Sequence, residues 1–168
     1  RNLAEAYRIL YEHYRYSYVV PGELRPRPFA TRDARQRSIA ASALAPGDAD
    51  GLETVGELFD DETNPGRKRP FAMRAVMRSL IDVDGGFLER WNAWVGAETA
   101  IVWDAHVGGH PITLIGIESR NVPRDGFHPS DGPDTWNGGT LFPQSSKKVA
   151  RAINAASGNR PVVVLANL

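Results

Sequence analysis

The chain has 168 residues, of which 42% are hydrophobic and 24% charged, as in an ordinary soluble globular domain. Lys and Arg together number 20, as do Asp and Glu, and this net charge of zero argues against a protein built to hold nucleic acid or an anionic membrane. The absence of Cys excludes a disulfide framework, a thiolate nucleophile and a cysteine-ligated zinc site. No apolar run approaches the ~20 residues that span a bilayer, so we expect a cytoplasmic protein with no membrane or nucleic-acid partner.

An aromatic stripe at helical spacing opens the chain and predicts a helix. We expect the stripe to pack on a neighbouring domain, and a platform that stacks on a ligand is the alternative. The first residue is Arg1 and no clear capping sequence precedes the helix, so we expect a segment of a longer protein. The stripe consists of Leu3, Tyr7, Leu10, Tyr11 and Tyr14.

Residues 21–51 are rich in Pro, Gly and Arg and lack a clear period, which predicts an inter-domain connector with one short helix. A second unit begins near Leu52. Its first strong pattern follows Pro70 and predicts a helix that ends before Asp84-Gly85-Gly86. The stretch FLERWNAW, residues 87–94, is interpreted as another short helix.

The remaining pattern predicts the order strand, strand, helix, strand. Two strands flank a turn at Gly108-Gly109, and a long irregular loop follows over residues 120–140. PQSSKKVARAINAAS predicts a helix with Val149, Ile153 and Ala156 on one face. The final run VVVLA predicts a strand that is buried on both faces and pairs in parallel through a crossover. Ligand sites of open parallel sheets lie beyond the carboxyl ends of the strands.

Three potential metal ligands lie around the turn. Asp104 and His106 alternate onto one face of a predicted strand, and His110 follows the turn. Strand and turn geometry would spread these side chains, and no second cluster supports them. We therefore favour a hydrogen-bonded pair on the sheet face over a metal site.

A Gly-Gly pair ahead of a helix is the best candidate for a binding site. Pro143 favours a helix start, where unpaired N–H groups and the dipole attract anions, and Gly-Gly permits close backbone approach. We expect a phosphate, or a carbonyl oxygen gaining negative charge, to bind here. A capped helix with solvated lysines is the alternative. The candidate residues are Gly138, Gly139, Thr140, Ser145, Ser146, Lys147 and Lys148.

The stretch DGPDTWNGGTLFPQSSKKVARAINAASGNRPVVVLANL resembles the carboxyltransferase domain of biotin-dependent acyl-CoA carboxylases, of the type fused into large acetyl- or propionyl-CoA carboxylases. YRILYEHYRYSYVVPGE, RKRPFAMRAVMRSLID and WDAHVGGHPITLIGIES support the resemblance. The family shares a Ser, a Lys three positions on and an Ala two further, which match Ser145, Lys148 and Ala150.

The resemblance implies an α/β, crotonase-like fold of strand-strand-helix repeats in two halves. Residues 1–20 would be the last helix of the N-terminal half, 21–51 a connector and 52–168 the truncated start of the C-terminal half. The family moves a carboxyl group from carboxybiotin to the α-carbon of an acyl-CoA such as acetyl- or propionyl-CoA. It stabilises two oxyanions and uses no metal in this domain.

The resemblance also implies partners and cofactors. Biotin would be carried on a biotin carboxyl carrier domain or subunit, and ATP would be used by a separate biotin carboxylase. Homo-oligomers would form through carboxyltransferase dimerisation. The residues expected to bind substrate or biotin are Gly138, Gly139, Thr140, Ser145, Ser146 and Lys148, with the PRDGF and HPSDGPD stretches as a channel wall.

The family's next motif, S-G-F-D-G-S-P, and its first half are absent from the sequence. We therefore expect the parent protein to be an enzyme and this segment alone to be inactive. Two other functions stay open. One is a non-catalytic assembly module that uses its tyrosines and tryptophans for subunit contact, and the other is an enoyl-CoA hydratase-like enzyme on the same fold.

Overall fold

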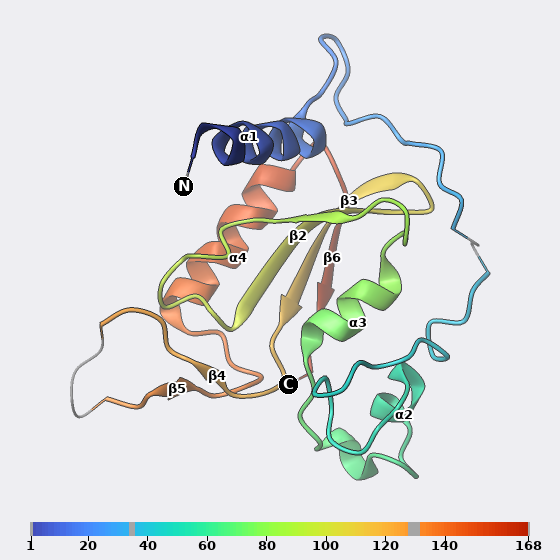
Figure 1. Cartoon of the computed structure of the whole chain (residues 1–168), viewed down its shortest axis with the longest axis vertical. Coiled ribbons are helices and arrows are strands. Elements are labelled where there is room, and N and C mark those ends of the chain that lie inside the picture. The colour runs from blue at the N-terminus through green and yellow to red at the C-terminus, as the bar shows by residue number, and fades with distance from the viewer. Residues whose placement is uncertain (1, 34–35, 128–131, 168) are drawn as a thin grey trace.

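A computed structural model describes residues 2–33, 36–127 and 132–167 (Figure 1). The fold is a mixed α/β arrangement, in which a four-stranded sheet of order β1-β2-β3-β6 is the centre. The helices are α1 (Leu3–Ser17), α2 (Val55–Phe59), the short 3₁₀ turn η1 (Pro65–Arg67), α3 (Met73–Leu80) and α4 (Pro143–Ala156). The strands are β1 (Phe87–Glu89), β2 (Ala100–Val107), β3 (His110–Ile117), β4 (Val122–Pro123), β5 (Thr135–Trp136) and β6 (Val162–Leu165).

The hairpin of β2 and β3 forms where the sequence predicts it. The strands are antiparallel, with Val107 opposite His110, and Gly108 and Gly109 between them have φ of 58° and 81°. Positive φ at both turn residues matches the twist of the flanking strands. Asp82 accepts hydrogen bonds from both glycine N–H groups at 2.7 Å, which ties the end of α3 to this turn.

Each face of the sheet is covered by one helix (Figure 1). On one face Trp103 and Leu114 pack with α3, and on the other Val102 and Ile115 pack with α4. Adjacent residues of β2 and β3 thus point to opposite layers. Gly116 lets α3 approach β3 closely, because a Cβ there would lie 2.6 Å from the Met77 sulfur.

β6 pairs in parallel with β3 after the α4 crossover, as predicted. The expectation that it is buried on both faces is wrong for this chain, since Val163 and Val164 are 38% and 54% exposed. β6 is the edge of the sheet, and the described residues cover it only in part. The apolar run correctly predicts a strand but not its burial.

The predicted helix over residues 87–94 is also wrong. Phe87–Glu89 forms the strand β1, antiparallel to β2, and the chain then continues in turns. Phe87 stacks on Trp103 with ring centroids 3.8 Å apart, and Leu88 is buried. These non-local contacts override the weak helical preference of the segment.

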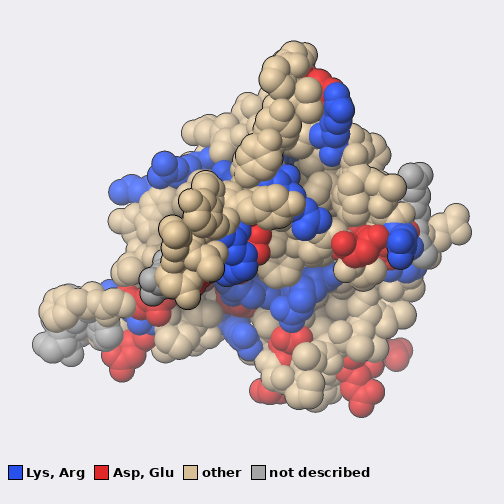
Figure 2. Space-filling model, turned by 45° about the horizontal axis from the view of Figure 1, so that its top comes forward, with Lys and Arg blue, Asp and Glu red and all other residues tan. Residues whose placement is uncertain are grey.

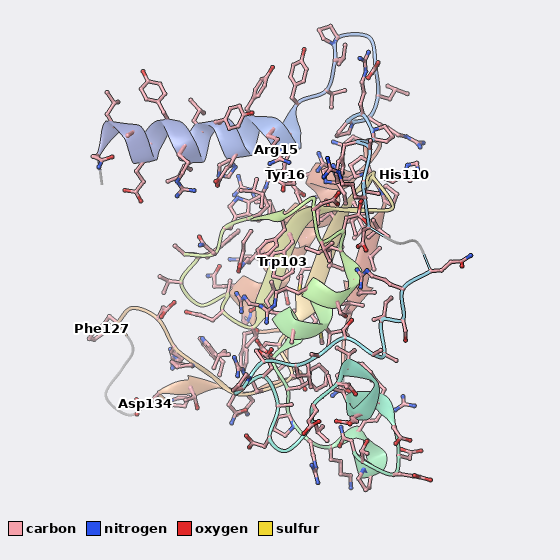
Figure 3. All side chains as sticks on the ribbon, turned by 45° about the vertical axis from the view of Figure 1, so that its right-hand side comes forward. Arg15, Tyr16, Trp103, His110, Phe127 and Asp134 are labelled. Atoms are coloured by element: carbon pink, nitrogen blue, oxygen red, sulfur yellow. The ribbon has the colours of Figure 1, made fainter. Side chains whose placement is uncertain are left out.

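α1 forms as predicted and carries a cap that the sequence reasoning overlooked. The Asn2 side chain accepts a hydrogen bond from the Glu5 N–H at 2.9 Å. Tyr16 is the buried side chain of α1 and donates a hydrogen bond to the Gly85 carbonyl at 2.8 Å. The aromatic stripe, from Leu3 to Tyr14, is 56–72% exposed, so its packing on a neighbouring domain stays a prediction. Figure 3 shows Arg15 and Tyr16 on the side of α1 that faces the rest of the chain.

The described part of residues 21–51 contains no helix, contrary to expectation, but the segment is anchored to the second unit. The Phe29 N–H donates to the Gly109 carbonyl at 3.0 Å, and the Phe29 ring meets His106 edge-on. The Arg37 guanidinium donates to the Ser79 and Ile81 carbonyls at the end of α3. This connector therefore folds as part of the packed structure.

Charge is unevenly spread despite its overall balance. Figure 2 shows Lys and Arg in a band across the middle of one face, while most Asp and Glu lie toward its lower edge and sides. Within residues 2–33, 36–127 and 132–167, no helix combines the length and apolar composition needed to cross a bilayer.

Candidate functional site

The Gly138-Gly139 loop lies beyond the carboxyl ends of β3 and β6, where parallel sheets place their ligands. The Gly138 N–H donates to the Asn121 Oδ1 at 3.0 Å, and the Gly139 N–H donates to the Glu118 carbonyl at 2.7 Å. The Asn167 amide, which follows β6, donates to the Ser119 hydroxyl at 3.3 Å. The ends of two strands and the start of α4 therefore meet at this loop.

Both glycines are required by this geometry. A Cβ at Gly138 would lie 2.3 Å from the Ser119 carbonyl oxygen, well inside van der Waals contact. Gly139 has a φ of +66°, which disfavours any side chain, and its Cβ would lie 3.2 Å from the Asn167 carbonyl. The close backbone approach expected at Gly-Gly is thus made by the protein's own strand ends.

The start of α4 keeps the features that attract an anion. Phe142 is the N-cap and Pro143 the first helical residue, no side chain of the described residues caps the helix, and the first turn holds no acidic residue. The N–H groups and dipole of this turn therefore favour negative charge. Thr140 and Ser146 are exposed beside it, as is Lys147. These three side chains can reach a bound molecule.

Ser145 and Lys148 are placed differently, because both are buried. The Ser145 hydroxyl lies 2.7 Å from the Thr99 hydroxyl, which precedes β2. Lys148 is 2% exposed, and no described residue offers its ammonium a hydrogen bond or an ion pair. Burial lowers the pKa of Lys148; the carboxylate of Glu89 opposes this shift, Arg74 adds to it and Glu98 opposes it.

The face of α4 that meets the sheet differs from the predicted one. The expectation places Val149, Ile153 and Ala156 together, and Ile153 is 44% exposed. Val149 and Ala156 do turn inward. The buried positions are Ser145, Lys148, Ala152 and Ala156, so a polar pair occupies the first two turns of the buried face.

Glu118 is a central residue of the site that sequence reasoning missed. It is 1% exposed, and its carboxylate accepts hydrogen bonds from the Met73 N–H at 2.9 Å and the Ser119 N–H at 3.1 Å. Arg74 Nη1 lies 3.8 Å from the other carboxylate oxygen. Glu118 thus joins the start of α3 to the end of β3. An acidic residue directly after an apolar strand was the available signal.

The long loop over 120–140 contains a small hairpin of β4 and β5 that is held by Glu98. The Glu98 carboxylate accepts hydrogen bonds from the Gly96 and Asp125 N–H groups and, at 2.7 Å, from the Trp136 indole. Burial raises the pKa of Glu98, but these hydrogen bonds outweigh it and the net pKa is lowered. Trp136 also packs on Phe142 with ring centroids 4.3 Å apart, which places the hairpin beside the start of α4.

The stretches expected to wall a channel belong to this hairpin. PRDGF is described, and Phe127, 96% exposed, points away from the body of the protein in Figure 3. Residues 128–131 of HPSDGPD lie outside the described residues. The role of either stretch as a wall stays a prediction.

The residues weighed as metal ligands are dispersed. Asp104 is buried and pairs with Thr113, Arg90 and Arg160. The His106 ring packs between Tyr16 and Phe29, and burial lowers its pKa. Asp104 thus bonds to Thr113 of the neighbouring strand, and His106 Nδ1 is buried with no hydrogen-bond partner among the described residues, so the pair expected among Asp104, His106 and His110 does not form through this atom. Among the described residues no three His, Cys, Asp or Glu side chains gather in a group that could hold a metal.

The chain is thus an α/β unit in which a helix start that attracts anions lies at the carboxyl ends of the strands. Comparison with known proteins identifies its family. Residues 34–168 match the carboxyl transferase domain family. The chain therefore belongs to this family.

Two curated relatives are acetyl-CoA carboxylases. One, "Acetyl-CoA carboxylase dmxL1" of Cryptosporiopsis sp., is 27% identical over 146 residues, which cover 74% of this chain and 6% of the relative. The other, acetyl-CoA carboxylase of Saccharomyces cerevisiae, is 33% identical over 91 residues, which cover 49% of this chain and 4% of the relative. The chain spans only a small part of the length of either relative.

Proposed function

We propose that this chain is a segment of an acyl-CoA carboxylase carboxyltransferase. The parent protein would move a carboxyl group from carboxybiotin to the α-carbon of an acyl-CoA such as acetyl- or propionyl-CoA. The observation that carries this proposal is the carboxyl transferase match over residues 34–168, which includes the whole of the candidate site. The names of both relatives agree with an acetyl-CoA substrate class.

The geometry of the site supports this chemistry. Removal of a proton beside a thioester puts negative charge on the thioester oxygen, and oriented donors at that oxygen lower the barrier. The uncapped first turn of α4 supplies such donors, and the Lys147 charge lies beside it. Carboxybiotin, when bound, supplies the carboxyl group.

The six candidate residues divide into two roles in this proposal. Thr140 and Ser146 are exposed and can contact the substrate or biotin. Gly138 and Gly139 hold the loop against the strand ends, and the Ser145 hydroxyl joins α4 to Thr99 ahead of β2, while Lys148 lies buried on the same face of α4. The buried Lys148 ammonium also adds positive potential near the helix start without direct contact.

Several further features follow from the same proposal. The fold would be the crotonase-like arrangement of two halves, with residues 1–20 ending the first half, 21–51 connecting and 52–168 starting the second. Biotin would arrive on a carrier domain or subunit, after carboxylation by a separate ATP-using biotin carboxylase. The parent protein would be a cytoplasmic homo-oligomer.

The experiment uses the full-length protein that contains this chain. We expect it to decarboxylate malonyl-CoA in a reaction that requires free biotin, which reports the reverse transfer. Thr140→Val combined with Ser146→Ala should lower this rate at least about tenfold. Ser157→Ala, at the far end of α4, is the matched control and should keep the rate. Hydration of an enoyl-CoA without biotin-dependent transfer would instead support the hydratase-like alternative. The absence of both activities would support an assembly module.

A further inference from the structure

A small polar cavity lies at the end of α4 opposite the candidate site. Its volume is about 90 Å³, room for about three water molecules at ~30 Å³ each. α4 has 14 residues, so at ~1.5 Å per residue the two ends are roughly 20 Å apart. The cavity is lined by Ser17, Arg90, Trp91, Val102, Asp104, Thr113, Ala152, Ala155, Ala156, Asn159 and Arg160.

Two guanidinium groups in this cavity share one carboxylate. Arg90 Nη1 lies 3.2 Å from one Asp104 oxygen, and Arg160 Nη1 lies 3.4 Å from the other. The side chains of Asp104 and Arg160 are only 7% and 6% exposed, and that of Arg90 is 20% exposed. The cluster therefore holds one positive charge in excess, largely shielded from water.

The other contacts of the arginines are neutral. Arg160 donates from Nε to the Asn159 side chain at 2.9 Å and from Nη2 to the Tyr16 carbonyl at 3.0 Å. Arg90 donates from Nη1 to the Ser17 hydroxyl, and no acceptor in the described residues meets its Nε or Nη2. The carbonyl end of α1 offsets part of the excess charge, since a helix end carries only about half a charge.

A third cation lies nearby. The guanidinium carbon of Arg151 is 5.6 Å from the centre of the Trp91 ring, and that of Arg90 is 5.2 Å from it. Among the described residues, no acidic side chain other than Asp104 lines the cavity. Burying unbalanced charge is costly unless an opposite charge compensates it, and guanidinium groups favour oxyanions through paired N–H donors.

We propose that this cavity binds a small oxyanion, of carboxylate or phosphate class, between Arg90 and Arg160. The bound anion takes the free Arg90 donors and neutralises the excess charge. It also links Arg90, which follows β1, to Arg160, whose Nη2 donates to the Tyr16 carbonyl of α1, so its binding stabilises the docking of α1 on the sheet. The site is separate from the candidate carboxyltransferase site and does not depend on the proposed function.

The test measures thermal unfolding of the full-length protein in sodium phosphate or sodium acetate, with ionic strength held constant by sodium chloride. A ligand that binds only the folded state raises the melting temperature in a saturable way. We expect a saturable rise with at least one of the two anions. Arg90→Gln and Arg160→Gln should each abolish it, while Arg25→Gln, an exposed charge change elsewhere, should retain it.

Asp104→Asn should strengthen anion binding, whereas the two arginine variants should abolish it. The Asp104→Asn change removes the competing carboxylate, so half-saturation should occur at an anion concentration at least about tenfold lower than in the wild type. If Arg160→Gln does not fold, Arg90→Gln decides, because it leaves the pair of Arg160 and Asp104 intact. The proposal is overturned if neither anion raises the melting temperature more than sodium chloride does. It is also overturned if the anions raise the melting temperature of Arg90→Gln as much as that of Arg25→Gln.

Discussion

Alanine substitutions at Gly138 and Gly116 test how the candidate loop is held. Neither glycine has a left-handed φ, so the cost of a methyl group at either position is steric. At Gly138 the added Cβ lies 2.3 Å from the Ser119 carbonyl oxygen and 2.6 Å from its carbon, and a backbone cannot rotate away. We expect Gly138→Ala to destabilise the loop by about 3 kcal/mol, the upper end for overpacking.

At Gly116 the same methyl group meets side chains instead. The Cβ lies 2.6 Å from the Met77 sulfur and 2.8 Å from the Met73 Cγ, and methionine adapts its shape readily. We expect Gly116→Ala to cost about 1 kcal/mol. The two variants form a matched pair, with equal chemistry and similar overlap but different neighbours.

Hydrogen exchange of the full-length protein measures the difference. The Gly139 N–H donates to the Glu118 carbonyl, so its protection reports whether the loop stays closed on β3. A cost of about 3 kcal/mol corresponds to exchange faster by on the order of 100-fold in Gly138→Ala. Equal exchange at this amide in the two variants would refute the placement of the loop against the strand end.

Three further substitutions test the buried polar groups. Lys148→Met should raise the free energy of unfolding at pH 7 by about 1 kcal/mol or more. Because the folded-state pKa of Lys148 is lowered, the wild type should regain stability relative to this variant as pH rises toward 10.5. If urea unfolding gives the same difference between the two proteins at every pH, the burial of Lys148 is contradicted. The wild type should lose stability as pH falls below 6.5, because burial lowers the pKa of His106 and the unfolded state therefore binds the proton first. His106→Phe should not show this loss. Melting temperatures that fall equally in both proteins between pH 7 and pH 5.5 would count against this prediction. Glu98→Gln should speed exchange of the Asp125 N–H about tenfold by weakening charge-assisted hydrogen bonds, with Glu62→Gln, an exposed acidic residue elsewhere, as the control.

Local sequence patterns predicted the elements whose contacts are themselves local or repetitive. The Gly108-Gly109 turn specified the β2–β3 hairpin, and Pro143 marked the start of α4. The helix prediction for residues 87–94 failed because the strand β1 depends on pairing with β2 and on the stacking of Phe87 on Trp103. A short segment carries little of that information in its own residues.

The sequence indicated the residues of the candidate loop but not how they are arranged. The Gly-Gly pair and the helix start lie at the carboxyl ends of the strands, as expected for a parallel pair. Lys148 was expected to meet a ligand, and it is buried instead, because it lies on the same face of α4 as Ala152. Glu118 and Asn121 hold the loop through contacts with residues far along the chain, and no periodic pattern marks such contacts.

Footprinting of the candidate loop by its substrates tests the central claim most directly. Hydrogen exchange of the full-length protein would be followed with and without acetyl-CoA and a soluble biotin derivative. We expect slower exchange in residues 139–147 with at least one of these ligands, and no change in the control segment 61–69 around η1. Carboxyl transfer at full rate with unchanged exchange in residues 139–147 would contradict the assignment of the site.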